Sequence, residues 1–178
     1  MTTKTTAMLA AVALGFAVTG AQAGDKAARE DATLSNAKVS LTQAIGIAEK
    51  EGSGQAISAD YSGKKGTMGN YDIKVLSSDG AKLTEYRVNT GTGKITKASN
   101  EPFEKVFTRI KPTDLQNAPT SLKSAITTAE SQSGGKAVDA DTDRSGDSVR
   151  YTVKVAKADG TTEKIKVNGA DGKVASAK

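Results

Sequence analysis

The sequence predicts an α+β fold made of two repeats, each with an N-terminal helix packed on a three- or four-stranded antiparallel sheet. A strand motif occurs twice, at residues 71–75 (Tyr-Asp-Ile-Lys-Val) and at residues 151–155 (Tyr-Thr-Val-Lys-Val), and Asp-Gly follows each copy. An Ala-rich helical pattern precedes each motif, beginning at Leu41 and at Leu122. The offset is 81 residues for the helices (122 − 41) and 80 for the strands (151 − 71). Self-similarity at a fixed spacing indicates the architecture before any single-residue preference is considered.

Residues 1–23 have the three parts of a secretory signal peptide. Lys4 provides the positive start, residues 7–18 are apolar, and Ala21-Gln22-Ala23 is a small-residue cleavage pattern. An apolar N-terminal core helix is the alternative, which this three-part order disfavours. The run is shorter than the roughly 20 residues of a membrane span, and no later stretch approaches that length. We therefore expect a mature chain of 155 residues (178 − 23), periplasmic in a Gram-negative cell or secreted from a Gram-positive one.

The composition excludes several kinds of chemistry. The chain has no Cys, no His and no Trp, so thiolate catalysis, His-containing triads, ordinary zinc sites and disulfides are excluded. The net charge is +5, with lysines scattered through both repeats. Solvated strand faces explain this pattern, and weak attraction to anionic envelope polymers or lipid headgroups is the alternative. We expect no nucleic-acid partner, because no long basic run is interleaved with aromatic residues.

The first repeat is predicted over residues 40–98, after a flexible tether at 24–39 that is polar and charged. Ser40 and Gln43 have the spacing of a capping box. Helical spacing places an apolar stripe behind them, and Gly52 and Gly54 are expected to end the helix. A short strand at 56–61, the alternating strand at 71–75, a hairpin turn, a return strand and a strand from Ile95 complete the repeat.

The second repeat is predicted over residues 120–178 in the same order. Thr120 or Ser121 opens its helix, and Gly134-Gly135 closes it. Strands are expected at 137–141, at 151–155, around Ile165 and Val167, and from Val174. Each unit has about 55 residues, a size at which a lone core is marginal. We therefore expect the repeats to dock, with two separate beads as the alternative.

The inter-repeat segment at residues 99–119 contains a predicted short amphipathic helix. Phe103, Val106, Phe107 and Ile110 have helical spacing after Pro102, and Pro112 is expected to end the helix. Core or inter-repeat packing is the first interpretation of this stripe. An exposed stripe that docks into a partner is the second.

The repeated pattern resembles the PepSY domain. The resemblance is carried by the helix at 41–49, the strand at 71–75, the Asp-Gly hairpin, and the Val-Asn-Thr-Gly-Thr-Gly-Lys-Ile ending at 88–95. The second copy, residues 122–174, has the same order. The resemblance implies an exported regulator of peptidases and brings no catalytic residues. The tandem layout is also similar to the β-lactamase inhibitor protein fold, which usually carries disulfides. Since no peptidase domain follows in the sequence, a propeptide acting in cis is not expected.

Three local motifs are candidates for a metal-binding, phosphate-binding or catalytic site. The acidic cluster Asp139–Asp147 starts like an EF-hand loop, but Arg144 replaces the turn Gly and Arg150 replaces the bidentate Glu. Residues 91–94 (Gly-Thr-Gly-Lys) lack the spacing of a phosphate loop and precede a strand. Residues 121–124 (Ser-Leu-Lys-Ser) lack the Ser-x-x-Lys spacing of a Ser-Lys dyad. We therefore expect no catalytic, cofactor-binding or metal-binding residues, while partner-binding residues are not identified.

The function predicted from these observations is that of an exported non-enzymatic binding module. The PepSY resemblance favours modulation or inhibition of an envelope peptidase, by a surface that occludes the cleft of its partner. Binding of a small ligand or an anionic cell-envelope polymer is one alternative. A structural envelope protein without a discrete ligand is another.

Overall fold

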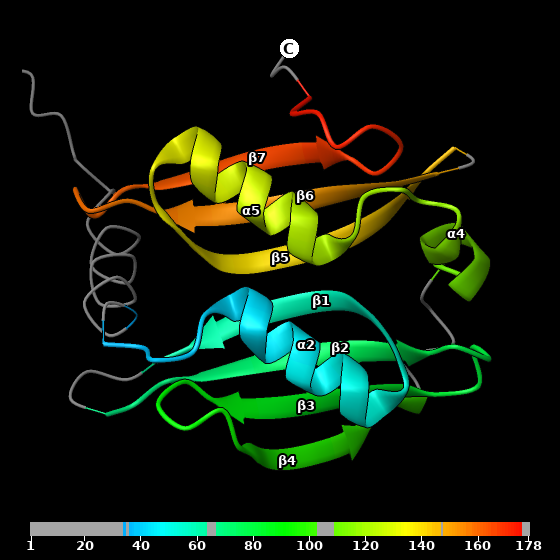
Figure 1. Cartoon of the computed structure of the whole chain (residues 1–178), viewed down its shortest axis with the longest axis horizontal. Helices are drawn as coiled ribbons and strands as arrows, with labels where there is room; N and C mark the ends of the chain where they lie inside the picture. The colour runs from blue at the N-terminus through cyan, green and yellow to red at the C-terminus, as the bar shows by residue number, and fades with distance from the viewer. Residues whose placement is uncertain (1–33, 35, 64–66, 103–108, 147, 176–178) are drawn as a thin grey trace, which may run out of the picture.

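The computed structural model describes residues 34, 36–63, 67–102, 109–146 and 148–175. It has the α+β class that the sequence predicts, with a seven-stranded antiparallel sheet that carries helices on one face (Figure 1). The helices are α2 (Leu41–Gly52), α4 (Pro112–Gln116) and α5 (Leu122–Ser133). The strands are β1 (Gly54–Ser62), β2 (Asn70–Ser77), β3 (Leu83–Asn89), β4 (Ile95–Asn100), β5 (Lys136–Ser145), β6 (Ser148–Ala156) and β7 (Thr162–Asn168).

The strand order is β4-β3-β2-β1-β5-β6-β7. The sequence predicts a separate sheet in each repeat, and the structure has a single sheet instead. β1 and β5 join the two halves by antiparallel pairing of Ser58 with Asp141, Ala59 with Ala140, and Asp60 with Asp139. We call these three residue pairs the seam. From the seam, the first half of the chain runs outward to β4 and the second half runs outward to β7 (Figure 1).

The two long helices lie side by side on the same face of the sheet, α2 against β1–β3 and α5 against β5–β7 (Figure 1). Ser40 caps α2 and forms the predicted capping box with Gln43, and Ser121 caps α5. Each helix buries the predicted stripe of two large and two small residues: Leu41, Ala44, Ile45 and Ala48 in α2, and Leu122, Ala125, Ile126 and Ala129 in α5. These alanines are fully buried, so the helix backbones come close to their neighbours.

Each helix is tied to the sheet by the same two polar contacts. The Tyr71 hydroxyl donates to the Val39 carbonyl at 3.2 Å, and the Tyr151 hydroxyl donates to the Thr120 carbonyl at 2.5 Å. Both carbonyls precede the capping serine of a helix. Further along the helices, the carboxylates of Glu49 and Glu130 accept hydrogen bonds from the backbone N–H groups of residues 56 and 137, where the first strand of each half begins. The repeated Tyr and Glu of the sequence therefore hold helices in place.

The helices end where the sequence predicts, at Gly52 and before Gly134, but the residue that caps α2 differs from the expectation. In α2, the left-handed position that follows the helix is Ser53 (φ 47°), not a glycine. Gly54 instead starts β1 at a close approach, where an added Cβ would lie 2.1 Å from the Leu76 carbonyl oxygen. In the second half, Gly134 takes the left-handed conformation (φ 70°) and Gly135 makes the close approach. In the first half, residue spacing alone does not show which residue adopts the left-handed conformation and which makes the close approach, because serine occupies the left-handed position that glycine usually fills.

The segment predicted to be a flexible tether ends in contact with the sheet. The backbone N–H groups of Lys38 and Val39 both donate to the Thr90 carbonyl, at 3.0 Å each. Leu34 is buried in the core. The end of the predicted tether therefore contacts the folded domain through Leu34, Lys38 and Val39, while the side chain of Lys38 stays exposed. Residues 24–33, and the predicted signal peptide at 1–23, lie outside the described residues.

The inter-repeat segment contains a short helix that the sequence did not predict. Pro112 was expected only to end a helix, but it also begins α4, with Lys111 as the N-cap. An added Cβ at Gly80, in the β2–β3 turn, would lie 3.0 Å from Pro112. Asp114 lies 3.9 Å from Arg144 of β5. α4 thus contacts both halves. Ile110 is buried in the core, whereas Phe103, Val106 and Phe107 lie outside the described residues.

The two halves share one hydrophobic core, so the docking that the sequence predicts is confirmed over separate beads. Side chains beneath α2 and beneath α5 belong to the same contiguous cluster, and Ala59 and Ala140 of the seam lie within it. Lys123 of α5 pairs with Glu49 of α2 at 2.7 Å, which adds a polar contact between the helices.

Replacing Ser53 by Gly should stabilise the fold by about 1 kcal/mol, because glycine adopts the left-handed conformation without the strain that a Cβ causes. Part of this gain is offset, since glycine gives the unfolded chain more conformational entropy. The reverse change in the second half, Gly134→Ser, should destabilise by a similar amount, since φ there is 70°. Urea unfolding of both variants measures these changes. A loss of stability in Ser53→Gly would contradict the assignment of strain to this residue.

Tyr151→Phe should lower stability by about 1 kcal/mol, because it removes the hydroxyl bond to the helix start. Burial raises the pKa of Tyr151 to about 12. The folded protein therefore holds this phenol neutral where the unfolded chain ionises, and stability should fall as the pH rises above about 10. Tyr151→Phe should weaken this fall, with Tyr86→Phe as the matched hydroxyl removal. Urea unfolding between neutral and alkaline pH measures it, and an unchanged slope would contradict the assignment.

Candidate binding surface

The face of the sheet opposite the helices is the candidate binding surface. Strand alternation turns Tyr71, Ile73 and Val75 of β2 toward the core, so Asp72 and Lys74 point to the other side. The same alternation and the pairing registers put charged residues on this open face in every strand of the central five. Toward the β2–β3 hairpin the face becomes apolar, where the cross-strand partners Leu76 and Leu83 are buried.

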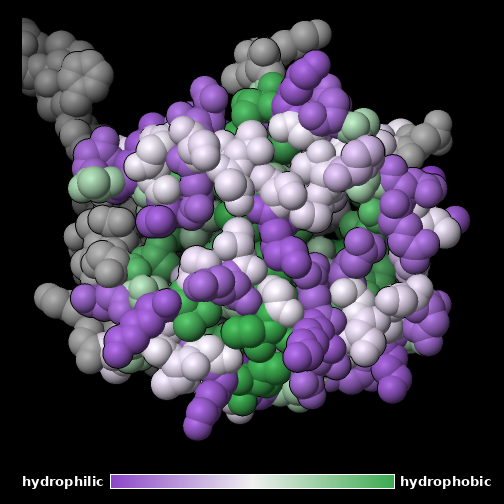
Figure 2. Space-filling model, in the orientation of Figure 1, coloured by the Kyte–Doolittle hydropathy of each residue, from purple (hydrophilic) through white to green (hydrophobic). Residues whose placement is uncertain are grey.

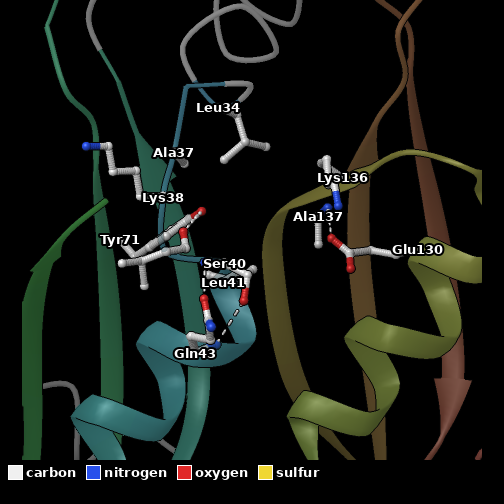
Figure 3. Close-up of a pocket in the computed structure, with 11 residues that line it drawn as sticks. Leu34, Ala37, Lys38, Ser40, Leu41, Gln43, Tyr71, Glu130, Lys136 and Ala137 are labelled. Atoms are coloured by element: carbon white, nitrogen blue, oxygen red, sulfur yellow. Dashed lines mark hydrogen bonds between the residues drawn. The ribbon is translucent and has the colours of Figure 1, made fainter. Parts of the chain in front are cut away.

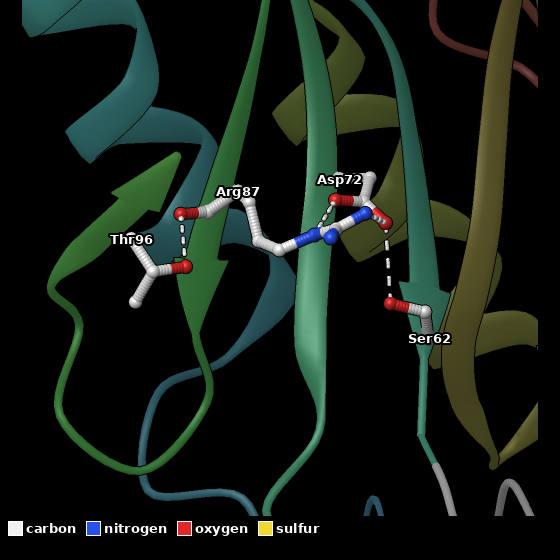
Figure 4. A network of polar contacts seen from close by, with 4 residues as sticks. All are labelled: Ser62, Asp72, Arg87 and Thr96. Carbon is white, nitrogen blue, oxygen red and sulfur yellow. Dashed lines mark hydrogen bonds and ion pairs between the residues drawn. The ribbon is translucent and has the colours of Figure 1, made fainter. Parts of the chain in front are cut away.

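Charges on the first half of the open face neutralise one another. Arg87 of β3 donates two hydrogen bonds to the carboxylate of Asp72 on β2, from Nε to Oδ1 at 2.6 Å and from Nη2 to Oδ2 at 3.0 Å (Figure 4). Asp72 also accepts a hydrogen bond from Ser62. The hydrogen bond to Asp72 and the charge of that carboxylate raise the pKa of the Arg87 guanidinium above its ordinary value. One step along the strands, Lys74 pairs in register with Glu85. Opposite charges thus face each other twice across β2 and β3.

The seam carries carboxylates at the centre of the open face. Asp60 of β1 lies directly opposite Asp139 of β5, and Asp141 lies opposite Ser58. Loss of hydration raises the pKa of the Asp141 carboxyl, and the negative charges of Asp139 and Asp143 raise it further. A hydrogen bond from Ser58 and the positive charge of Lys74 lower this pKa, but the net shift is upward. We call Asp60, Asp139, Asp141 and Asp143 the acidic stripe. Like charges facing each other across strands destabilise a sheet.

The acidic residues 139, 141 and 143 lie in an extended strand, not in a loop. The sequence placed them at a strand end and turn, whereas β5 continues through Ser145. Alternate side chains of a strand are spread along one face, so they do not wrap around a cation as an EF-hand loop does. Within the described ranges, no three acidic side chains form a group suited to a metal ion.

Charges on the second half of the open face are not balanced in this way. Position for position, Thr152 replaces Asp72 and Lys164 replaces Glu85, while Lys154 and Lys166 keep the basic charges of Lys74 and Arg87. Lys154 and Lys164 therefore lie opposite each other. We call Lys154, Lys164 and Lys166 the β6–β7 lysines. Sequence reasoning missed them, although aligning the two repeats would have revealed the lost acidic partners.

A pocket of about 180 Å³ lies between residues 34–43 and the start of β5 (Figure 3). It is smaller than the roughly 300 Å³ of typical ligand sites. Three of its polar side chains are already used, since Gln43 accepts from the Ser40 backbone, Glu130 accepts from the Ala137 backbone, and Tyr71 donates to the Val39 carbonyl. These contacts describe a joint in the fold and not a small-molecule site.

The helix-bearing side is mixed in character. Figure 2 shows polar residues around its margin and some apolar surface near β3 and β4. Of the large apolar side chains that the structure describes, Met68 is the exposed one, at 45%. The described helices include none with the length and apolarity needed to cross a bilayer. The predicted turn at residues 91–94 is confirmed, with Gly93 at φ 70° before β4.

Comparison with known proteins gives little further information. No family model matches the chain, and no curated protein sequence matches it either. A crystal structure titled as a "putative lipoprotein" from Clostridium difficile 630 aligns with a TM-score of 0.48 at 16% identity, and the alignment covers 83% of this chain and 97% of the other. The PepSY resemblance therefore stays a prediction from the sequence motifs.

Asp141→Asn should stabilise the protein at pH 7, because it removes a charge that its neighbours disfavour while an amide oxygen can still accept from Ser58. A raised folded-state pKa means that protonation stabilises the fold. Stability of the native chain should therefore gain from this group as the pH falls from 7 toward about 4, and Asp141→Asn should lack that gain. Urea unfolding at both pH values measures it, with Glu51→Gln on α2 as the charge-removal control. A destabilised Asp141→Asn at pH 7 would contradict the mechanism.

Proposed function

We propose that this chain is an exported, non-enzymatic binding module built from two copies of one helix-and-sheet unit. In this proposal the open face, with the sheet edge beside it, contacts another protein of the cell envelope. The observation that carries the proposal is that both long helices lie on one side of the sheet (Figure 1). The strand registers place charged side chains across the other side. A surface of this kind suits protein recognition better than the enclosure of a small substrate.

The signal-like sequence at residues 1–23 supports export, and the PepSY resemblance supports a peptidase as the partner. The mechanism would be occlusion, in which a rigid surface covers the entrance of the partner's active site. The continuous sheet over a single core favours this mechanism, because a preorganised surface loses little entropy on binding. The chain would supply no reacting group. Its lack of Cys and His agrees with such a role.

Photo-crosslinking of the full mature chain in envelope extract tests this proposal. A photoreactive residue at Lys97 or Asp143 samples the open face, and one at Lys50 or Thr127 samples the helix-bearing side. We expect the same envelope protein to be crosslinked from both open-face positions and not from the helices. Its purified peptidase activity should fall when the chain is added. Crosslinks confined to the helix positions, or a partner whose activity never changes, would overturn the proposed face or the proposed modulation.

A further inference from the structure

The β6–β7 lysines form a compact group of unbalanced charge on the open face. Lys154 and Lys164 are direct cross-strand neighbours, which places their Cβ atoms about 5 Å apart. Lys166 follows Lys164 on the same face, about 7 Å along β7. Among the described residues, the ion pairs that lie nearest to these lysines in the sequence are Lys157 with Glu163 and Lys173 with Asp171. Neither of these acids pairs with the three lysines. Lys154 has Asp139 of β5 across the strand on its other side, so Lys164 and Lys166 are the two that face no acid.

The first half of the chain provides an internal comparison. There the corresponding basic residues face acids, Arg87 facing Asp72 and Lys74 facing Glu85. Cross-strand pairs of like charge weaken a sheet, whereas pairs of opposite charge strengthen it. The pairing of Lys154 with Lys164 between β6 and β7 is therefore worse for stability than the equivalent pairing of Lys74 with Glu85. A ligand of negative charge would supply the missing acids.

The edge of β7 is more accessible than the edge of β3. Strand β4 pairs with β3 from Thr84 to Val88. Among the described residues, β7 is met at its edge only by Val174 opposite Val167 and by the Ala175 N–H, which donates to the Lys166 carbonyl. Because backbone groups of alternate residues point the same way, Thr162 and Lys164 also turn their N–H and C=O groups away from β6. An extended chain could bond to them.

The acidic stripe limits the width of such a ligand. Asp139, Asp141 and Asp143 lie on β5, two strands from β7 and therefore about 10 Å away. A broad anionic surface, such as a membrane, would bring negative charge over these carboxylates as well as over the lysines. A single extended segment along β7 would reach Lys164 and Lys166, and it would lie one strand further from the stripe than Lys154, which faces Asp139.

We propose that the edge of β7 receives an extended acidic segment of the partner protein by strand addition, with its carboxylates beside Lys164, Lys166 and Lys154. This inference rests on the proposed function and names the partner chemistry for it. Backbone hydrogen bonds to the β7 edge hold the segment, and alternate acidic side chains select it. The period of a strand, in which every second side chain faces the same way, matches the spacing of Lys164 and Lys166.

The test uses the full mature chain and a fluorescent synthetic peptide of alternating Glu and Thr, with binding followed by anisotropy at low and high salt. We expect salt-sensitive binding. The double variant T152D/K164E gives β6 and β7 the charge pattern of β2 and β3, and it should bind about tenfold more weakly. Because position 152 also lies opposite Asp141, urea unfolding checks that the variant is folded under the conditions of the binding assay. Binding unchanged in T152D/K164E would overturn the proposal.

Two further probes separate strand addition from simple charge attraction. A peptide of alternating Glu and Pro has the same charge, but every second residue lacks a backbone N–H and the fixed φ of proline disfavours a paired strand. It should therefore bind much more weakly than the Glu-Thr peptide. The reciprocal variant D72T/E85K creates unbalanced lysines on β2 and β3, where β4 covers the edge, and should gain no binding. Equal binding of the Glu-Pro peptide, tighter binding of polyphosphate or anionic vesicles, or a gain in D72T/E85K would overturn strand addition.

The crosslinked envelope partner distinguishes failure of this inference from failure of the proposed function. If T152D/K164E still crosslinks the partner from the open face as strongly as the native chain, the module stands and the β7 edge is not its contact. If the native chain crosslinks no partner from that face, the proposed function fails, whatever the peptides do.

Discussion

Three residue pairs between β1 and β5 turn two meanders into one sheet, and the remaining architecture depends on them. Their centre is Ala59 beside Ala140, both fully buried. These residues are 81 positions apart (140 − 59), the same offset that relates the two helices in the sequence. The two equivalent strands therefore meet at equivalent positions, which gives the joint an approximate twofold symmetry. Small side chains at this point let α2 and α5 lie side by side over the joint, so a single core forms beneath both.

The same pairing of β1 with β5 brings like charges together on the open face, which is unfavourable for stability. Antiparallel pairing about a central alanine places the residues on either side of it opposite one another, and these include Asp60 and Asp139. The core side of the seam is apolar and well packed, whereas the open side brings like charges together. The seam thus combines strong burial with unfavourable electrostatics, and solvent on the open face screens the latter.

The sequence predicted the elements that local chemistry determines. Ser40 and Gln43 have the capping-box spacing and cap α2 as predicted. The second helix was expected to open at Thr120 or Ser121, and Ser121 is its N-cap. The alternation at residues 71–75 and 151–155 fixed which side of each strand is buried. The joining of β1 to β5 could not be predicted in the same way, because edge pairing depends on backbone groups that every residue carries. α4 was missed because a helix of five residues has too few positions to show a period.

The candidate surface was missed for a related reason. Strands in which apolar residues alternate with lysine are common, because the lysines lie on the solvated face. Taken singly, none of the β6–β7 lysines therefore indicates a binding site. Their meaning depends on which residue lies across the strand, and that depends on register. Only the comparison of Thr152 with Asp72 and of Lys164 with Glu85 shows that two acids have been lost.

The order of the strands also bears on how the chain folds. Every strand pairing except the seam joins strands that are consecutive in the sequence, and such hairpins close quickly because their loops are short. The seam must instead bring together positions 81 residues apart, after the inter-repeat segment has turned back. Each meander should therefore form early with an unprotected β1 or β5 edge, and the chain is most prone to pair with a second molecule in the interval before those two edges meet.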